Sequence, residues 1–99
     1  MLTTLDENLE ERQSKLVMNP KYALYYSKYC YFCQKVMMNL RGREDLNIDL
    51  RSTSEREHAS ALMSGGGKTQ VPCLKIDDGS GNVQWMYESD DIIAYFASV

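Results

Sequence analysis

Two cysteines separated by two residues, at the junction of an expected strand and an expected helix, constrain this chain more than any other feature. The Cys30-Tyr31-Phe32-Cys33 stretch follows the apolar and aromatic run 22–26 and precedes an amphipathic segment that ends near Leu40. A cysteine pair of this spacing in a strand-to-helix turn is typical of redox-active dithiols. We therefore predict a fold that presents a thiol at the N-terminus of a helix.

The position of the pair predicts different roles for its two thiols. A helix that begins at Cys30 leaves its first backbone N–H groups without intrahelical partners, and these groups favour a negative charge. A thiolate carries such a charge, so we expect Cys30 to be the nucleophile. Cys33 lies close enough to attack a mixed disulfide formed on Cys30. It also shares the apolar helical face of Val36 and Leu40, so we expect it to be the buried, resolving thiol.

Zinc binding and a structural disulfide are the alternatives for this pair. A structural zinc site takes four ligands, and the chain offers only Cys73 and His58 beyond the pair. A structural disulfide suits a reducing compartment poorly, and one that closes so short a loop constrains little of the unfolded chain. We favour the redox interpretation and expect no metal.

Composition and charge exclude several classes of protein. The chain has 99 residues, 43% of them hydrophobic and 25% charged, as in one ordinary globular domain. Its net charge of -3 argues against nucleic acid as a partner, since phosphate binding requires a basic surface. No apolar run is long enough to cross a bilayer, and residues 1–10 do not resemble a secretory signal. The three cysteines and the absence of an export signal predict a cytoplasmic protein.

The chain divides at Pro20 into an N-terminal extension, 1–20, and a domain, 21–99. In the extension, Thr4 and Glu7 have the spacing of a capping box and predict a helix over 4–17. We interpret this helix as an addition to the domain surface, with a docking arm for a partner as the alternative.

Hydrophobic periodicity predicts the order β-α-β, α, β-β-α within the domain. Ser54 and Ser89 are expected to be N-caps, and Ala59, Leu62 and Met63 are expected to face inward. The initial β-α-β unit requires a parallel strand pair, and the final hairpin adds antiparallel strands. We predict an α/β fold with a four-stranded mixed sheet and helices on both faces. The expected elements are strands at 22–26, 46–50, 71–76 and 83–87, and helices at 30–41, 54–64 and from 89 onward.

Three stretches together resemble the glutaredoxin family, which has the thioredoxin-like fold, over roughly residues 21–99. They are residues 25–33 with the dithiol, Thr69-Gln70-Val71-Pro72, and Glu88-Ser89-Asp90-Asp91-Ile92. The resemblance implies a cis peptide bond between Val71 and Pro72 that faces the dithiol. It also implies glutathione as the cofactor, which would reduce the protein.

The resemblance further implies where glutathione binds. The backbone of Val71 would pair with its cysteinyl part, and the helix start at Ser89 and Asp90 would receive its γ-glutamyl end. Free N–H groups at a helix N-terminus suit a carboxylate, and Asp90 can accept from an ammonium group. Lys28, with Lys68 or Gln70, would meet the glycyl carboxylate. The residues expected to bind glutathione are Lys28, Tyr31, Gln70, Val71, Pro72, Ser89 and Asp90.

The sequence also departs from the glutaredoxin pattern. Tyr31 and Phe32 replace the proline and tyrosine that are common between the cysteines, so a redox potential cannot be carried over. Some family members without that proline bind an iron–sulfur cluster between two subunits. The Tyr87-Glu88-Ser89 phrase also resembles the glutathione-binding signature in the N-terminal domain of glutathione transferases.

The resemblance therefore implies a monomeric, glutathione-dependent thiol–disulfide oxidoreductase that acts on protein disulfides or glutathionylated proteins through Cys30 and Cys33. Two alternatives remain open. One is a glutathione-ligated iron–sulfur scaffold or sensor, and the other is a thioredoxin-like electron donor that a flavoprotein reduces. Cys73 is interpreted as a buried small residue, with regulatory oxidation as its alternative role.

Overall fold

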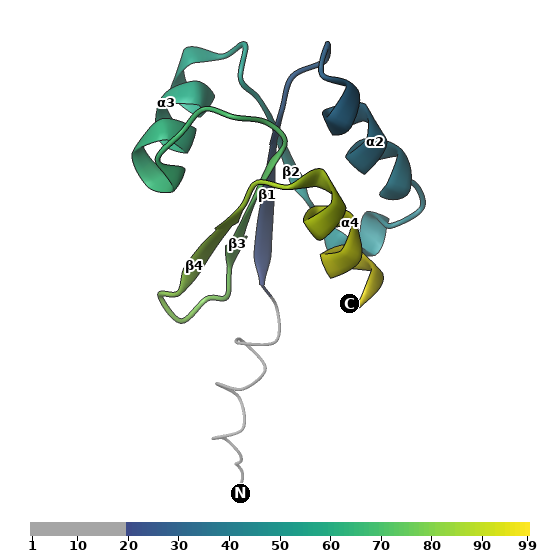
Figure 1. Ribbon diagram of the computed structural model, residues 1–99. Helices are drawn as coiled ribbons and strands as arrows, with labels where there is room; N and C mark the ends of the chain where they lie inside the picture. The colour runs from purple at the N-terminus through teal and green to yellow at the C-terminus, as the bar shows by residue number, and fades with distance from the viewer. Residues whose placement is uncertain (1–19) are drawn as a thin grey trace, which may run out of the picture.

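The computed structural model describes residues 20–99 (Figure 1), so the helix predicted at 4–17 lies outside the described residues. The helix that carries the dithiol ends slightly earlier than predicted. Within residues 20–99, no helix combines the length and the apolar character that crossing a membrane requires. In chain order the elements are β1 (Lys21–Tyr26), α2 (Tyr31–Asn39), the 3-10 turn η1 (Glu44–Leu46), β2 (Asp49–Ser52), α3 (Arg56–Gly66), β3 (Cys73–Asp77), β4 (Val83–Met86) and α4 (Ser89–Ala97).

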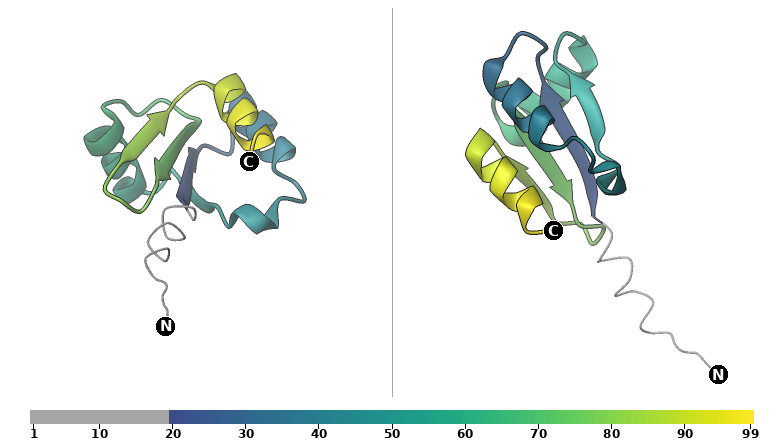
Figure 2. Two further views of the ribbon diagram at one scale, coloured as in Figure 1. Left: turned by 90° about the horizontal axis from the view of Figure 1, so that it is seen from below. Right: turned by 90° about the vertical axis from the view of Figure 1, so that its right-hand side faces the viewer.

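The strands form one mixed sheet in the order β2-β1-β3-β4. β1 runs parallel to β2 and antiparallel to β3, and β3 pairs antiparallel with β4. Helices α2 and α4 lie side by side on one face of the sheet, and α3 covers the other face (Figures 1 and 2). The predicted four-stranded mixed sheet with helices on both faces is thereby confirmed.

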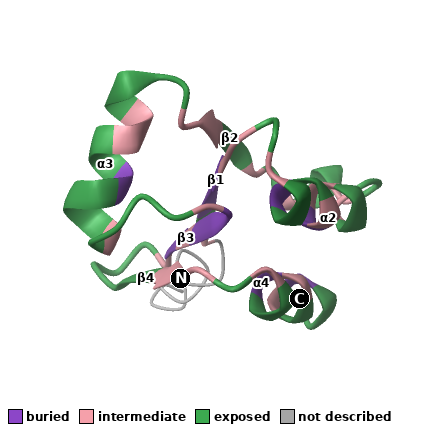
Figure 3. Cartoon of the chain, turned by 45° about the horizontal axis from the view of Figure 1, so that its top comes forward, coloured by how far each residue is buried: buried purple, intermediate pink, exposed green. Residues whose placement is uncertain are grey.

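The central strand β1 is buried along most of its length because both of its faces are covered. Tyr22 and Leu24 point into the core beneath α2 and α4, whereas Ala23 and Tyr25 point into the core beneath α3. Figure 3 shows buried stretches of β1 and β3 at the centre of the fold. The nearly unbroken apolar run therefore corresponds to a strand between two helical layers, as the sequence predicted.

The second strand begins at Asp49 rather than at Leu46, so its predicted range was wrong. Leu46 ends the 3-10 turn, and Asn47 has a φ of 51°, a left-handed conformation that interrupts an extended strand. Leu46 and Ile48 pack against the core beneath α2 and α4 from this connection, while Leu50 is 48% exposed. The apolar alternation thus reflects a packed turn that leads into an edge strand.

Helix α3 forms where predicted, but its start and its inward face differ. The N-cap is Glu55, without a side-chain cap, so the predicted capping role of Ser54 was wrong. The Ser54 hydroxyl instead lies 2.8 Å from the Ser52 hydroxyl. Leu62 is fully buried as expected, whereas Met63 is 51% exposed, so the expectation that Met63 faces inward was wrong.

Two glycines allow α3 to approach β4 closely. Gly65 and Gly66 belong to the helix, and Gly67 follows it with a φ of 93°, which glycine adopts readily. A Cβ atom on Gly65 would overlap the Trp85 ring, and one on Gly66 would overlap the Tyr87 hydroxyl. The glycine run therefore serves close packing as well as helix termination.

Candidate redox site

The sulfur of Cys30 occupies the N-cap position of α2. A tight turn after β1, in which the Cys30 N–H donates to the Ser27 carbonyl at 3.1 Å, brings the residue to the helix start. The Cys33 N–H then donates to Cys30 Sγ at 3.2 Å. This geometry gives one of the unpaired helix N–H groups a sulfur acceptor, and a thiolate is a stronger acceptor than a neutral thiol. The predicted location of Cys30 at a helix N-terminus is confirmed.

Cys33 is fully buried, whereas Cys30 is partly exposed. Burial, together with the hydrogen bond to Cys30, raises the pKa of the Cys33 thiol to about 12. Cys33 therefore remains a neutral thiol at physiological pH. Both are free thiols. One thiol is thus accessible and the other is enclosed one helical turn away.

The loop before β3 lies against the dithiol. The Val71–Pro72 peptide bond is cis, as the resemblance implied. The Cys30 thiol lies 3.8 Å from the Val71 carbonyl oxygen, to which it donates when it is protonated. Pro72 is buried, and Val71 is half-buried. The dithiol and the Val71–Pro72 loop therefore form one site.

A cavity of about 160 Å³ extends from this loop to the start of α4. Four of the residues expected to bind glutathione, Gln70, Val71, Pro72 and Ser89, line it. Its other lining residues are Phe32, Tyr87 and Glu88, which were not among the seven residues expected to bind glutathione. Tyr87 and Glu88 nevertheless belong to the phrase that resembles the glutathione transferase signature.

Two larger hollows, each of about 340 to 350 Å³, lie elsewhere and include no residue of the Val71–Pro72 loop. One adjoins the C-terminal end of α2, and the other adjoins the start of β1 and the end of β3. We assign the site to the smaller cavity because it contains the loop that contacts Cys30.

Helix α4 begins with open backbone donors. Glu88 is the N-cap and has no side-chain cap bond, so the predicted capping role of Ser89 was wrong. Ser89 is instead the first helical residue, and it lines the cavity. The first N–H groups of a helix have no intrahelical acceptor, so this end of the cavity suits an anionic group.

The remaining predicted ligands, Lys28, Tyr31 and Asp90, are not among the residues that line this cavity. Lys28 is exposed, with its ammonium group 5.2 Å from the centre of the Tyr29 ring. Tyr31 is 73% exposed, and its ring meets that of Phe32 edge to face. Asp90 is paired with Lys35 of α2, with 2.9 Å between Lys35 Nζ and Asp90 Oδ1.

Cys73 directly follows the cavity-lining Pro72 and is fully buried at the start of β3. Burial raises the pKa of its thiol to about 11, although the nearby Tyr87 hydroxyl partly offsets this effect. Tyr87 in turn donates to the Lys68 carbonyl at 2.9 Å, and the Lys68 ammonium lies 4.7 Å from the centre of the Tyr87 ring. These facts agree with the interpretation of Cys73 as a small core residue.

His58 does not approach the dithiol. Among residues 20–99, the one cluster of three metal-type ligands is Glu55, Glu57 and His58 at the start of α3, and it contains no cysteine. The His58 Nδ1 atom lies 3.1 Å from the Ser52 carbonyl oxygen. The histidine that was considered as a zinc partner for the cysteines thus lies with carboxylates instead.

The strand order β2-β1-β3-β4, with a C-x-x-C motif at the start of the helix after β1, defines a thioredoxin-like fold. Among solved structures, a disulphide isomerase from Xylella fastidiosa Temecula1 is similar in fold. The TM-score is 0.58 at 12% sequence identity, and the match covers 99% of this chain and 97% of that one.

A family model of the glutathione S-transferase N-terminal domain matches residues 24–98. The chain belongs to this family. The similarity expected from Tyr87-Glu88-Ser89 is therefore confirmed at the level of the domain. A search of the curated proteins finds no match.

Proposed function

We propose that this chain is a glutathione-dependent thiol–disulfide oxidoreductase of the glutaredoxin type. The observation that carries the proposal is the asymmetry of the dithiol. Cys30 Sγ accepts a helix N–H at a partly exposed position, while Cys33 is enclosed and has a pKa of about 12. An accessible nucleophile next to an enclosed thiol is the arrangement that a two-step disulfide exchange requires.

In the first step, the Cys30 thiolate attacks one sulfur of a substrate disulfide. The substrate S–S bond breaks, a mixed disulfide forms on Cys30, and the other substrate sulfur leaves as a thiolate. The Cys33 N–H, 3.2 Å from the attacking sulfur, stabilises the thiolate before attack. The step needs no external oxidant or reductant, because one thiolate and one disulfide are present both before and after it.

In the dithiol route, Cys33 resolves the mixed disulfide. Its thiol loses a proton, which the departing substrate thiolate can take up, and its sulfur attacks Cys30 Sγ. The products are the reduced substrate and an internal Cys30–Cys33 disulfide, so two electrons have passed from the protein to the substrate. Because burial keeps Cys33 protonated, it does not compete with Cys30 for the first attack.

Two molecules of glutathione would restore the dithiol and leave as glutathione disulfide. In the monothiol route, glutathione resolves the mixed disulfide in place of Cys33. The cavity supports glutathione as the reductant, because its lining includes the Val71–Pro72 loop and the open start of α4. The backbone of the Val71–Pro72 loop can pair with the peptide backbone of glutathione, and the N–H groups at the start of α4 can bind a carboxylate.

Exposed aromatic side chains around Cys30 support a protein as the substrate. Tyr29, Tyr31 and Phe32 are 87%, 73% and 54% exposed. Exposed aromatic residues are typical of surfaces that contact other proteins. They are close neighbours of Cys30 in the chain, so a protein that bears the target disulfide would contact them during exchange.

A coupled assay tests the proposal. The purified chain is given a glutathionylated protein and reduced glutathione, and glutathione reductase reports the formation of glutathione disulfide. We expect turnover by the wild-type chain, loss of at least 100-fold in Cys30→Ser, and full retention in the control Cys73→Ser. Activity in Cys30→Ser that equals that of the wild type would exclude the proposed nucleophile.

The two alternatives are tested with the same preparation. A protein reduced only by a flavoprotein reductase, and not by glutathione, would be a thioredoxin-like donor. A brown dimer from anaerobic purification, with visible absorption that disappears in Cys30→Ser, would support the iron–sulfur scaffold. A colourless monomer that turns over glutathione supports the oxidoreductase.

A further inference from the structure

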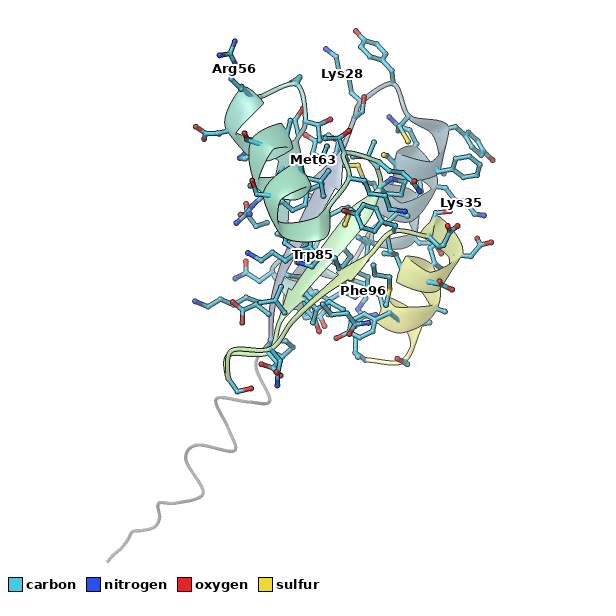
Figure 4. The ribbon with its side chains drawn as sticks, turned by 60° about the vertical axis from the view of Figure 1, so that its left-hand side comes forward. Lys28, Lys35, Arg56, Met63, Trp85 and Phe96 are labelled. Atoms are coloured by element: carbon cyan, nitrogen blue, oxygen red, sulfur yellow. The ribbon has the colours of Figure 1, made fainter. Side chains whose placement is uncertain are left out.

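An ion pair joins the two helices that flank the cavity. Lys35 Nζ donates to Asp90 Oδ1 at 2.9 Å, and the side chains are 40% and 83% exposed. The carboxylate holds the pKa of Lys35 above its usual value. Figure 4 shows Lys35 on α2 reaching toward the start of α4. Exposed ion pairs of this kind contribute little to stability, so stability alone does not account for its position.

Both members of the pair are close in the chain to residues that line the cavity. Lys35 follows the lining residue Phe32 by one turn of α2, and Asp90 directly follows the lining residue Ser89 at the start of α4. Residues three apart on a helix are neighbours on its surface. A positive and a negative charge therefore lie side by side, each close in the chain to a residue that lines the cavity.

Both charged groups retain capacity for a ligand. An ammonium group has three donors, of which Lys35 uses one on Asp90. The second oxygen of the exposed Asp90 carboxylate is a further acceptor. The pair can therefore bind an anion and a cation at the same time.

We propose that Lys35 is a specificity-determining residue that binds the α-carboxylate of the ligand's γ-glutamyl end, while Asp90 binds the adjacent α-ammonium group. This inference rests on the proposed glutathione dependence. In an α-amino acid, two bonds of about 1.5 Å each join the ammonium nitrogen to the carboxylate carbon. Neighbouring opposite charges on the ligand thus match the neighbouring opposite charges of Lys35 and Asp90.

The same ion pair allows an opposite role for Lys35. If Lys35 only occupied Asp90, it would compete with the ligand ammonium and weaken binding. The two roles predict opposite effects of removing the Lys35 charge. A tighter complex in Lys35→Met would indicate competition, and a weaker complex would indicate recognition of the carboxylate.

The test uses the full chain, reduced, with two ligands that cannot undergo thiol exchange. One is S-methylglutathione, and the other is the same compound with its γ-glutamyl α-carboxylate converted to a carboxamide. Titration calorimetry gives the Kd of each. We expect Lys35→Met to bind S-methylglutathione about twofold to fivefold more weakly than the wild type does, as for one exposed charge pair.

The decisive quantity is the penalty for the carboxamide. This penalty should shrink in Lys35→Met by the same factor of about twofold to fivefold, because the charge that recognises the carboxylate is gone. Lys35→Arg should keep the wild-type penalty. The control Lys21→Met removes an equal charge at the exposed start of β1 and should change neither Kd.

Each outcome decides between the claims. Unchanged or tighter binding of S-methylglutathione by Lys35→Met, or an unchanged carboxamide penalty, would overturn the role of Lys35 and leave glutathione dependence standing. Failure of the wild-type chain to bind S-methylglutathione at all would overturn both. A purely structural role of Lys35 would weaken both ligands equally, so it would also leave the penalty unchanged.

Discussion

Selective alkylation tests the asymmetry of the three described thiols. Cys33 and Cys73 are fully buried and have pKa values of about 12 and about 11. At pH 7, five pH units below its pKa, Cys33 is a thiolate in about one molecule in 10⁵, and Cys73 in about one in 10⁴. An unperturbed cysteine, with a pKa of about 8.5, is a thiolate in about three molecules in 100.

Because the thiolate is the reactive form, folding should slow the alkylation of Cys33 at least 1,000-fold and that of Cys73 at least 100-fold. Cys30 remains accessible at the helix start. A short treatment of the reduced chain with iodoacetamide at pH 7 should therefore modify Cys30 first.

Peptide mass spectrometry with fragmentation gives the rate at each cysteine, since Cys30 and Cys33 share a peptide. The same treatment in urea is the control, and it should label all three thiols at similar rates. Alkylation of Cys33 within tenfold of the rate at Cys30 in the folded chain would refute the asymmetry on which the exchange mechanism depends. Equal alkylation rates of Cys33 and Cys73 in the folded chain and in urea would refute the asymmetry as well.

Two further predictions concern stability. Gly65→Ala should lower the free energy of unfolding by about 1 to 2 kcal/mol, because overlap with the Trp85 ring outweighs the gain of about 1 kcal/mol in helix propensity. Urea denaturation measures this effect, and Ser64→Ala on the same helix should be neutral or stabilising; stabilisation by Gly65→Ala would disprove the close packing. The reduced chain should also lose stability as the pH rises from about 9 toward 11, because Cys33 and Cys73 then ionise in the unfolded chain but not in the folded one. Each thiol contributes a slope of about 1.4 kcal/mol per pH unit, so Cys73→Ser should flatten the profile, and an equally steep profile in that variant would contradict the assignment.

Local signals explain why much of the fold could be predicted. The strand before the dithiol is an apolar run, the helix after it has a clear apolar face, and the turn between β3 and β4 is rich in glycine and aspartate. Each signal lies within a few neighbouring residues. The Val71–Pro72 bond was predicted from the resemblance rather than from the chain itself, and it is cis as implied.

The errors arose where tertiary contacts outweigh local pattern. The alternation of Leu46 and Ile48 looked like a strand, yet both side chains pack inward from the connection around η1. Ser54 and Ser89 are favourable caps by residue type, but the helices begin one residue after Glu55 and Glu88. Capping preference alone does not fix where a helix begins.

Part of the site could be predicted because the cysteines and the Val71–Pro72 loop belong to recognisable short motifs. Phe32 stands between the cysteines, so its place in the motif was a signal that it would lie near the site. The pairing of Lys35 with Asp90 depends on how α2 packs against α4, and no short pattern in the sequence indicates it.

The most direct test of the central claim is to trap the first intermediate. Cys33→Ser removes the resolving thiol, so a glutathione mixed disulfide formed by exchange should persist. The variant is incubated with glutathione disulfide, and the modified cysteine is located by peptide mass spectrometry. We predict one glutathione per chain, attached to Cys30. Attachment at Cys73 instead, or no adduct on Cys30 while the unfolded chain reacts readily, would contradict the assignment of Cys30 as the nucleophile.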